Sequence, residues 1–563
     1  MNSLSLRFFK STSLVLAVFQ ALFLWLLHHL IQSRIWPATQ PHWFVPAYLI
    51  VIFTPITFYL LWPYRSAAIL RRWTTYLIFF LLIAGYLGFR DLPALTNDTD
   101  LDEARIAGFV IPWIIAWLIG IPLVRTRLES TYWRIPYKVF FRNCGRCYLT
   151  LGEASVFVGL FWSLLQLCAA LFLTLDINFF EEIFTDPRFA YPATTLALAI
   201  AIQIIDNNDE LFQTVLNHVL AILKWFLPLS GAIAIIFSIA LIPKLPTLLF
   251  SGQRIIDSST LFALVVFNLL FFNAAYREGD TDSIYAPWLQ RVLRVIPPLL
   301  VLIAITGLYS LSIRIWELGL TPARYWGFMT GIFSVFFSMG YGYASFQKDP
   351  WLKTIEAINT RLLVVIFFTL LVSLTPPADP FRLSVSSQIN RSINGLTMES
   401  TSGALQYLRF DSGERGRRAL NGLAQGAYDI PDLDKRSFIQ NESKRMLALK
   451  SKKDLKSGGG SATPDRYREW RSQLKIIPSS STIDQQLEDA IRQEFLRSAS
   501  MLDPIGKKIP SPRLIFVDLD GDEIAEALLL SGALRGDPLQ MRDFIAFKIS
   551  NGGWIRWSSG QWG

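Results

Sequence analysis

The stretch STSLVLAVFQALFLWLLHHLI, residues 11–31, decides the fold class because it is long, apolar and free of Asp, Glu, Lys and Arg. A helix rises about 1.5 Å per residue, so about 20 apolar residues cross the roughly 30 Å hydrocarbon layer of a membrane. Arg7 and Lys10 precede the run, as basic residues precede the core of a secretory signal peptide. The run is longer than such a core, and no small-residue cleavage site follows it. We therefore predict an uncleaved first membrane span.

Ten more stretches of this kind follow, and the interior of each lacks these charged residues. They are Trp43–Trp62, Trp73–Phe89, Ile106–Val124, Ala154–Leu175, Phe189–Ile205, Trp225–Pro243, Leu261–Tyr276, Val295–Ile313, Tyr325–Phe346 and Leu362–Leu374. The chain of 563 residues has a mean hydropathy of +0.36, and 17% of its residues are charged, against about 25% in average soluble domains. The sequence predicts an all-α polytopic membrane bundle of about eleven transmembrane helices over residues 1–376.

Basic residues are concentrated in alternate connections between these stretches. The connection 125–148 holds six Lys and Arg residues, whereas the acidic connection Arg90–Arg105 holds five Asp and Glu residues. Cytoplasmic loops of membrane proteins are enriched in Lys and Arg. The pattern predicts a cytoplasmic N-terminus, and an odd number of spans then places the C-terminal part outside. The sixth, eighth and eleventh stretches are short, and the loss of one of them would reverse that last step.

The connection 125–148 also contains several aromatic residues. We expect it to lie on the inner membrane surface, where each basic residue gains about 1 kcal/mol from anionic lipid. The alternative is a loop that only sets the topology. Because the net charge of +9 resides largely in such short loops, we expect a lipid bilayer and not nucleic acid as the partner.

The composition changes after Thr375. Pro376, Pro377 and Pro380 predict the end of the last membrane helix. Residues 377–456 read as a polar helical stalk with amphipathic helices at Asp411–Gln425 and Leu433–Lys450. Residues 457–464, SGGGSATP, form a flexible linker pattern.

Residues 465–563 predict a small extracytoplasmic α+β domain. A helix is expected at Ser481–Met501, and the Asn551-Gly552 pair predicts a tight hairpin between the last two strands. The expected strands are Leu514–Asp518, Glu526–Leu530, Phe544–Ser550 and Trp554–Trp557.

Between the first two of these strands lies the clearest candidate site. Asp518, Asp520 and Asp522 alternate along the chain, Ile524 can offer its carbonyl, and Glu526 occupies the ninth position. Such oxygen ligands suit Ca²⁺, but the bidentate Glu of an EF-hand is missing, so we expect weak, structural binding. The pattern is more similar to the strand–loop–strand calcium loops of integrin-type propeller repeats. The alternative is a solvated acidic turn.

Other constellations are weak. Cys144 and Cys147 form a C-x-x-C in a connection without a second pair for zinc or a thioredoxin-like context. Asn268 and Asn273 are five residues apart, so we expect them to hydrogen-bond between helices. The span interiors lack acidic residues, which argues against ion-coupled transport and intramembrane hydrolysis. We assign no catalytic residue, no cofactor other than Ca²⁺, and favour a non-enzymatic role.

Three stretches carry a resemblance to a known family. They are NAAYREG (Asn273–Gly279) leading to YAPWL (Tyr285–Leu289), LGLTPARYW (Leu318–Trp326), and YLRFDSG (Tyr407–Gly413) with GRRAL (Gly416–Leu420). Together they resemble domain-of-unknown-function family 4153, a bacterial family of multi-pass membrane proteins, over roughly residues 100–425. The resemblance implies a bacterial inner-membrane protein with a periplasmic tail. It implies no activity and no binding residues.

Three functions are compatible with these features. The first is a non-enzymatic envelope platform or sensor, whose outer domain binds an unidentified envelope protein and Ca²⁺. The second is a facilitated transporter of an uncharged or lipid-like substrate, for which a central cavity lined by Asn268, Tyr309 or Tyr343 would be evidence. The third is an envelope-acting membrane enzyme with paired carboxylates from the connection Arg90–Arg105. We rank them in this order.

Overall fold

The computed structural model divides into two compact units, Met1–Ile439 and Gln440–Gly563. It describes residues 3–64, 68–90, 103–130, 135–206, 209–247, 257–279, 285–347, 352–395, 398–449, 467, 470–472, 474–478, 483–502, 513–519, 525–530, 542–550 and 553–562. The division falls within helix α18 (Leu433–Ala448), so the segment expected as a stalk is shared between the units. The expected linker 457–464 lies outside the described residues.

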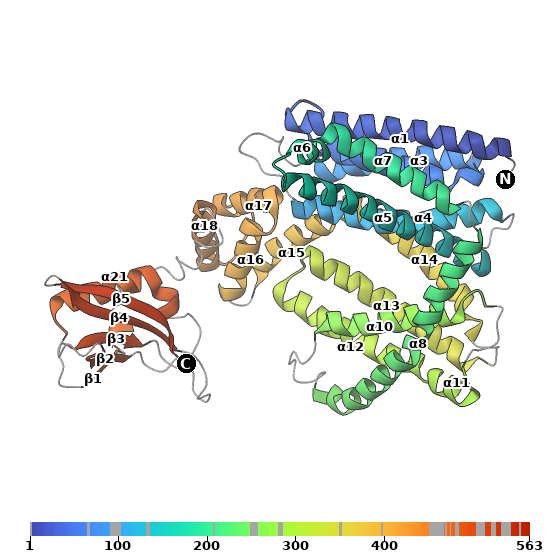
Figure 1. The fold of residues 1–563 in the computed structure, drawn as a ribbon. Helices are drawn as coiled ribbons and strands as arrows, with labels where there is room; N and C mark the ends of the chain where they lie inside the picture. The colour runs from blue at the N-terminus through green and yellow to red at the C-terminus, as the bar shows by residue number, and fades with distance from the viewer. Residues whose placement is uncertain are drawn as a thin grey trace. The chain divides into compact units, whose positions relative to one another are not determined.

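Apolar helices make up most of the first unit (Figure 1). They are α1 (Ser3–Gln32), α2 (Pro41–Leu60), α3 (Ala68–Phe89), α4 (Glu103–Glu129), α5 (Tyr137–Leu173), α6 (Phe179–Thr185), α7 (Pro187–Asp206), α8 (Asp209–Leu241), α10 (Ser258–Tyr276), α11 (Pro287–Leu293), α12 (Ile296–Leu318), α13 (Pro322–Phe346) and α14 (Ile355–Ser373). Polar helices follow: α15 (Pro380–Asn394), α16 (Met398–Phe410) and α17 (Gly413–Gln425).

Within the described residues, nine helical segments are long and apolar enough to cross a membrane. They are Thr12–Gln32, Pro41–Leu60, Glu103–Glu129, Tyr137–Leu173, Pro187–Ile205, Phe212–Thr247, Ser258–Tyr276, Pro287–Leu318 and Ile355–Ser373. The prediction of a multi-pass helical membrane bundle is confirmed at this level. The third predicted span lies on a shorter apolar helix, Thr74–Phe89, and the tenth lies on α13, which is not among the nine. The count of eleven stays a prediction.

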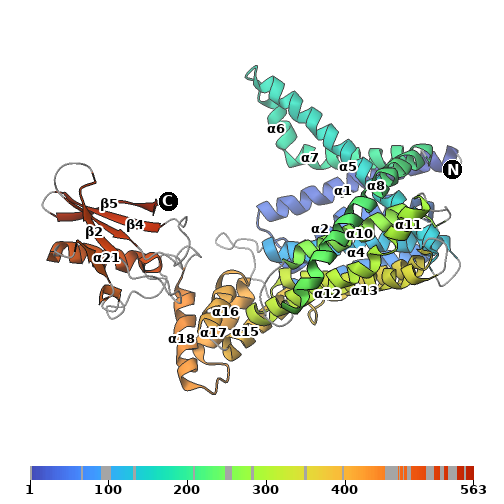
Figure 2. The same ribbon diagram turned by 90° about the horizontal axis from the view of Figure 1, so that it is seen from below.

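Helix α5 corrects the expectation for the connection 125–148. It begins at Tyr137, well before the predicted start at Ala154, and α4 continues to Glu129. Tyr137 and Phe140 are buried at helical spacing, and this burial outweighs the basic residues of the segment. The stretch is therefore mostly two helix ends, and its four residues 131–134 lie outside the described residues. Figure 2 shows α5 extending with α6 and α7 beyond the neighbouring helices.

The helix ends of the first unit gather on two faces. The first, which we call the Glu129 face, holds the ends of α2 and α4 and the start of α5. Arg125 donates to the carbonyl of Leu60 at 3.2 Å, and the Asn143 amide donates to Glu129 at 3.3 Å. Because α2 and α4 end where α5 begins, α5 crosses the bundle in the opposite direction.

The same face holds the end of α10 and the start of α14. The Tyr137 hydroxyl, at the start of α5, donates to Asn273 near the end of α10 at 3.4 Å. The Tyr276 hydroxyl then donates to Glu356 in the first turn of α14 at 2.6 Å. These contacts join distant parts of the sequence at one end of the bundle.

The opposite ends form the second face, which we call the Asp379 face. Arg105, at the start of α4, donates to the Gly88 carbonyl near the end of α3. The Arg105 guanidinium also lies 4.0 Å from the Asp379 carboxylate, and Arg415 of α17 lies 2.6 Å from it. Asp379 in turn accepts from the Phe381 amide and so caps the start of α15. These contacts of Asp379 attach the polar helices α15 and α17 to the bundle.

Helix α15 also packs on the turn between α12 and α13. Gln388 donates to the carbonyls of Leu318 and Leu320 at 3.1 Å each, and Ser384 donates to Leu320 at 3.0 Å. Gly319 has a φ of +72° in this turn, a conformation that favours glycine. Pro380 begins α15, so it does not merely end the last membrane helix as expected.

The second unit is a mostly antiparallel sheet with one helix packed on it (Figures 1 and 2). The strands lie in the order β1 (Lys475–Ile477), β2 (Arg513–Val517), β3 (Glu526–Leu530), β4 (Arg542–Ser550) and β5 (Gly553–Trp562), with β1 parallel to β2. Leu487, Ile491 and Phe495 of α21 (Gln485–Leu502) share a core with Leu514 and Leu529. The predicted α+β character and four strands are confirmed. β1 was not predicted, because three residues carry no readable periodicity.

Candidate functional site

Four helices of the first unit, α4, α10, α13 and α14, line a cavity of about 760 Å³. This volume is within the range of about 300–1,000 Å³ found for small-molecule sites. Helix α13 lines it from Trp326 to Phe337, which is about 16 Å of helix at about 1.5 Å per residue. The cavity therefore extends over roughly half the thickness of a bilayer core.

The cavity wall is apolar. None of the described residues that line it is charged, and most are aliphatic or aromatic. Its polar members are Asn273, Thr330, Ser334 and Thr369. A charged ligand group would lose its hydration here without gaining a charged partner, which is strongly unfavourable. The wall suits an uncharged, apolar ligand.

The exposed part of the wall lies on α4 and α10. Ile111 and Ile115 of α4 and Val266 and Leu270 of α10 all line the cavity and are each more than 40% exposed. Both helices are among the nine apolar segments that can cross a membrane. These side chains offer an apolar rim through which a chain-like molecule could enter from lipid.

A buried polar network adjoins the cavity through Asn273, near the Glu129 face. We call Tyr137, Asn273, Tyr341 and Asn359 the Asn273 network. The Asn273 amide donates to the Tyr341 hydroxyl at 2.8 Å, and its oxygen accepts from Asn359 at 2.6 Å and from Tyr137 at 3.4 Å. Tyr341 donates to Asn359 at 2.8 Å. The network joins α5, α10, α13 and α14, and confirms that Asn273 bonds between helices.

Asn268 also bonds between helices, with α8. Its side-chain oxygen accepts from Ser230 of α8 at 3.2 Å, and it is fully buried. The cavity is thus lined by Asn273 and not by Asn268, and Tyr309 and Tyr343 are not among its described lining residues either. The cavity wall that we named as evidence for a transporter is therefore not found, and the cavity that is present has a different wall.

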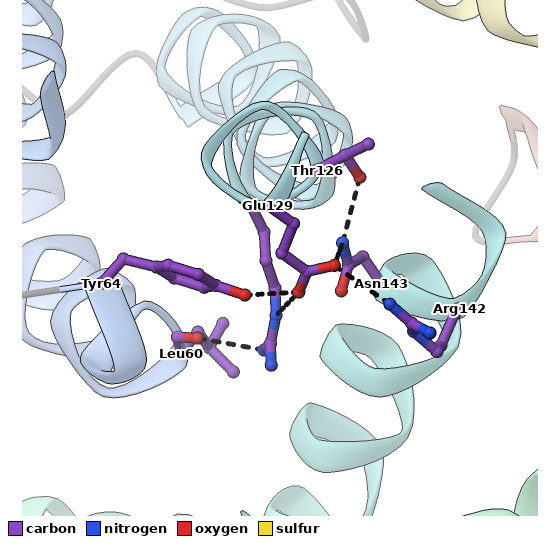
Figure 3. Close-up of polar contacts among 7 residues, drawn as sticks. Leu60, Tyr64, Thr126, Glu129, Arg142 and Asn143 are labelled. Carbon is purple, nitrogen blue, oxygen red and sulfur yellow. Dashed lines mark hydrogen bonds and ion pairs between the residues drawn. The ribbon is translucent and has the colours of Figure 1, made fainter. Parts of the chain in front are cut away.

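A cluster of charged and polar side chains on the Glu129 face surrounds Glu129 itself (Figure 3). Tyr64 and Asn143 donate to its two carboxylate oxygens, and Arg142 lies 3.2 Å from one of them. Arg125 lies 3.8 Å from the other. Burial, followed by the bond to Glu129, raises the pKa of Tyr64 to about 12, so this hydroxyl stays a donor at neutral pH. Because both oxygens of Glu129 are engaged, the cluster joins three helices and offers no free base.

The acidic loop is only partly described. Asp518 is exposed at the end of β2, whereas Asp520, Asp522 and Ile524 lie outside the described residues. Glu526 is 1% exposed; one of its oxygens accepts from the Leu519 amide at 2.7 Å, and the other lies 3.8 Å from Lys548. Antiparallel pairing of β2 with β3 confirms the strand–loop–strand setting. Among the described residues, no group of three or more His, Cys, Asp and Glu could hold a metal.

The C-x-x-C motif lies within a helix. Cys144 and Cys147 lie in the first turns of α5, one half-buried and one buried, so the C-x-x-C is helical and not in a loop as expected.

In the connection Arg90–Arg105, residues 91–102 lie outside the described residues, and the hypothesis of paired carboxylates there stays a prediction. Arg105, at the end of this connection, donates to the Gly88 carbonyl and forms an ion pair with Asp379.

The cavity and the Asn273 network could not be located from the sequence. Asn273, Tyr341 and Asn359 are polar residues within apolar helices, which is a signal of interhelical bonding. Their partners lie 68 and 86 residues apart along the chain, and nothing in the sequence pairs them. No family model matches this chain, and neither a curated protein nor a solved structure matches it.

Proposed function

We propose that this protein binds an uncharged, lipid-like molecule in the cavity between α4, α10, α13 and α14. The observation that carries the proposal is an apolar cavity of about 760 Å³ with an exposed rim on two membrane-type helices. It moves the second of our three functions, facilitated movement of a lipid-like substrate, ahead of the platform. The second unit, Gln440–Gly563, has a core of its own, and binding of an envelope protein stays a prediction for it.

The site can be tested by filling it. Ala107 of α4 lines the cavity and is exposed, so Ala107→Trp places an indole where the ligand would lie. We expect about tenfold less lipid to co-purify with this variant, as measured by mass spectrometry of protein extracted from membranes. Ala104→Trp is the matched control, because Ala104 is also exposed on α4 but does not line the cavity. Equal lipid content in wild type and both variants would exclude binding at this site.

We further propose that the protein lies in a bacterial inner membrane with the Glu129 face in the cytoplasm. Basic side chains at that face, including Lys138, Arg142, Arg146 and Arg294, support this orientation. Anionic lipid would then meet the first turns of α5, where Arg142 is 45% exposed. Helices α15 to α17 follow from the Asp379 face, which supports a periplasmic C-terminal unit. The resemblance to family 4153 agrees with this placement.

We also propose weak Ca²⁺ binding for the second unit. Asp518, Asp520, Asp522, Ile524 and Glu526 would bind Ca²⁺ weakly, between β2 and β3. Calorimetry on the fragment Gln440–Gly563 should show sub-millimolar to millimolar Ca²⁺ binding that Asp520→Ala removes. The fragment must include β1 and Trp470, because Trp470 belongs to the core. A flat titration of the folded wild-type fragment at millimolar Ca²⁺ would end this idea.

A further inference from the structure

The cavity lies between two hydrogen bonds that join α13 to α14. The hydroxyls of Tyr325 and Ser373 are hydrogen-bonded at 2.9 Å, close to the start of α13 and the end of α14. Tyr341 donates to Asn359 at 2.8 Å further along the same pair of helices. Tyr341 follows Tyr325 by 16 residues, or about 24 Å of helix. The first bond marks the end of the cavity near the Asp379 face, and the second marks the end near the Glu129 face.

Polar groups that a ligand can use lie at the Asp379 end of the wall. Trp326 lines the cavity beside Tyr325; its indole N–H makes no hydrogen bond with the residues that the structure describes, and its nitrogen is not fully buried. Thr330 and Thr369 line the cavity about one helical turn further in. Each donates to a carbonyl of its own helix at 2.9 Å, so its oxygen can still accept. This end therefore offers one donor and two acceptors.

The Glu129 end of the described wall has no polar group left for a ligand. The Asn273 amide donates both protons and accepts two hydrogen bonds, all within the Asn273 network and its own helix, which uses its full capacity. Ser334 lies between the two ends, but its Oγ is fully buried within the wall and is out of a ligand's reach. Phe337, the last lining residue of α13, is apolar. The cavity thus has a polar end and an apolar end.

The exposed rim lies at a depth that suits the leaflet on the Asp379 side. Ile111 and Ile115 follow Glu103, the first residue of α4, by 8 and 12 residues, which places the rim about 12–18 Å from that end of the helix. Half of the hydrocarbon layer is about 15 Å thick. A lipid of this leaflet has its polar end towards the Asp379 face and can enter sideways without turning over. A lipid of the opposite leaflet would have to carry its polar end across the hydrocarbon layer, which is unfavourable.

We propose that the cavity takes an uncharged acylglycerol-like lipid from the leaflet on the Asp379 side, and binds it with its polar end near Trp326 and its hydrocarbon chain towards the Asn273 network. This inference rests on the proposed function and names the class, the source and the orientation of its ligand. The ester and hydroxyl oxygens of an acylglycerol can accept from Trp326, and its hydroxyls can donate to Thr330 or Thr369.

The test maps the orientation of a monoacylglycerol that carries a photoactivatable diazirine, on the full chain in lipid nanodiscs. One form of the probe has the diazirine beside the ester, and the other has it at the end of the chain. Cross-links are located by mass spectrometry, and comparison of the two forms at the same residue cancels that residue's own reactivity. We expect the ester form to exceed the chain-end form about fivefold at Trp326, the ratio for one net hydrogen bond, and the reverse at Phe337.

A triple variant removes the polar groups and keeps the shape of the wall. Trp326→Phe, Thr330→Val and Thr369→Val together should make the two forms equal at positions 326 and 337. Thr306→Val is the matched control, because Thr306 of α12 also donates to a carbonyl of its own helix but is not among the cavity's described lining. It should keep the orientation of the wild type.

The outcomes separate this inference from the proposed function. Equal cross-linking of the two forms at both ends in the wild type would overturn the inference, as would the reverse orientation, which a lipid of the opposite leaflet would show. An unchanged orientation in the triple variant would overturn it too. If Ala107→Trp still removed the cross-links in those cases, the proposed function would stand without this orientation. If Ala107→Trp left them unchanged, or if neither form reached a lining residue, the proposed function would fail as well.

Discussion

Asn273→Ala should lower the free energy of unfolding by about 3 kcal/mol. The substitution removes the acceptor of Tyr137 and of Asn359 and one donor to Tyr341. Tyr341 is fully buried and Asn359 is 3% exposed, so water cannot easily replace these bonds. Each buried polar group left without a partner costs about 1–3 kcal/mol. Thermal unfolding of the purified protein in detergent would show the loss as a lower midpoint temperature.

Asn268→Ala provides the comparison within the same helix. Asn268 is as buried as any residue of α10, but among the described residues its bonds outside its own helix reach only Ser230. We expect a loss of about 1 kcal/mol, near the average for interhelical bonds in membranes. A midpoint for Asn273→Ala equal to or above that of Asn268→Ala would mean that the Asn273 network does not hold the helices together.

Glu129→Ala should be nearly as destabilising, by about 2–3 kcal/mol. Arg125 is 6% exposed on its side chain and would lose the carboxylate at 3.8 Å, and removal of one partner from a largely buried ion pair is costly. Tyr64 and Asn143 would each lose an acceptor as well. Thermal unfolding of the purified variant in detergent would show this loss as a lower midpoint temperature.

Glu181→Ala is a suitable control for Glu129→Ala, because Glu181 is an exposed acid on α6. We expect a change within about 0.5 kcal/mol for it, as for most surface substitutions. Similar midpoints for the two variants would show that the Glu129 cluster contributes no more than a surface charge.

The apolar helices were predictable because hydropathy and length suffice to identify them. The start of α5 was not, because Lys138, Arg142 and Arg146 lower the hydropathy of a segment whose Tyr137 and Phe140 are buried. A regular apolar face within a polar stretch was the signal available there.

The role of residues after Thr375 could not be predicted for a similar reason. Ser384 and Gln388 are polar and suggest a solvated stalk, yet both bond to backbone carbonyls of the turn between α12 and α13. Such contacts depend on which turn lies beside α15, and the sequence pattern does not identify that turn. The motifs Leu318–Trp326 and Tyr407–Gly413 meet there as well, through Ser384.

The cavity can hold a membrane-soluble ligand only if its helices lie in a bilayer with the Glu129 face on one side and the Asp379 face on the other. Single cysteines in a chain whose Cys144, Cys147 and Cys168 are replaced by Ala can test this with a membrane-impermeant thiol reagent. Trp316, near the Asp379 end of α12, is 90% exposed, and Lys138 is exposed at the Glu129 face. In the bacterial inner membrane proposed above, with the outer membrane opened, Trp316→Cys should be labelled while the inner membrane is intact, and Lys138→Cys only after the inner membrane is permeabilised. Labelling of both positions before permeabilisation, or of Lys138→Cys alone, would contradict the arrangement.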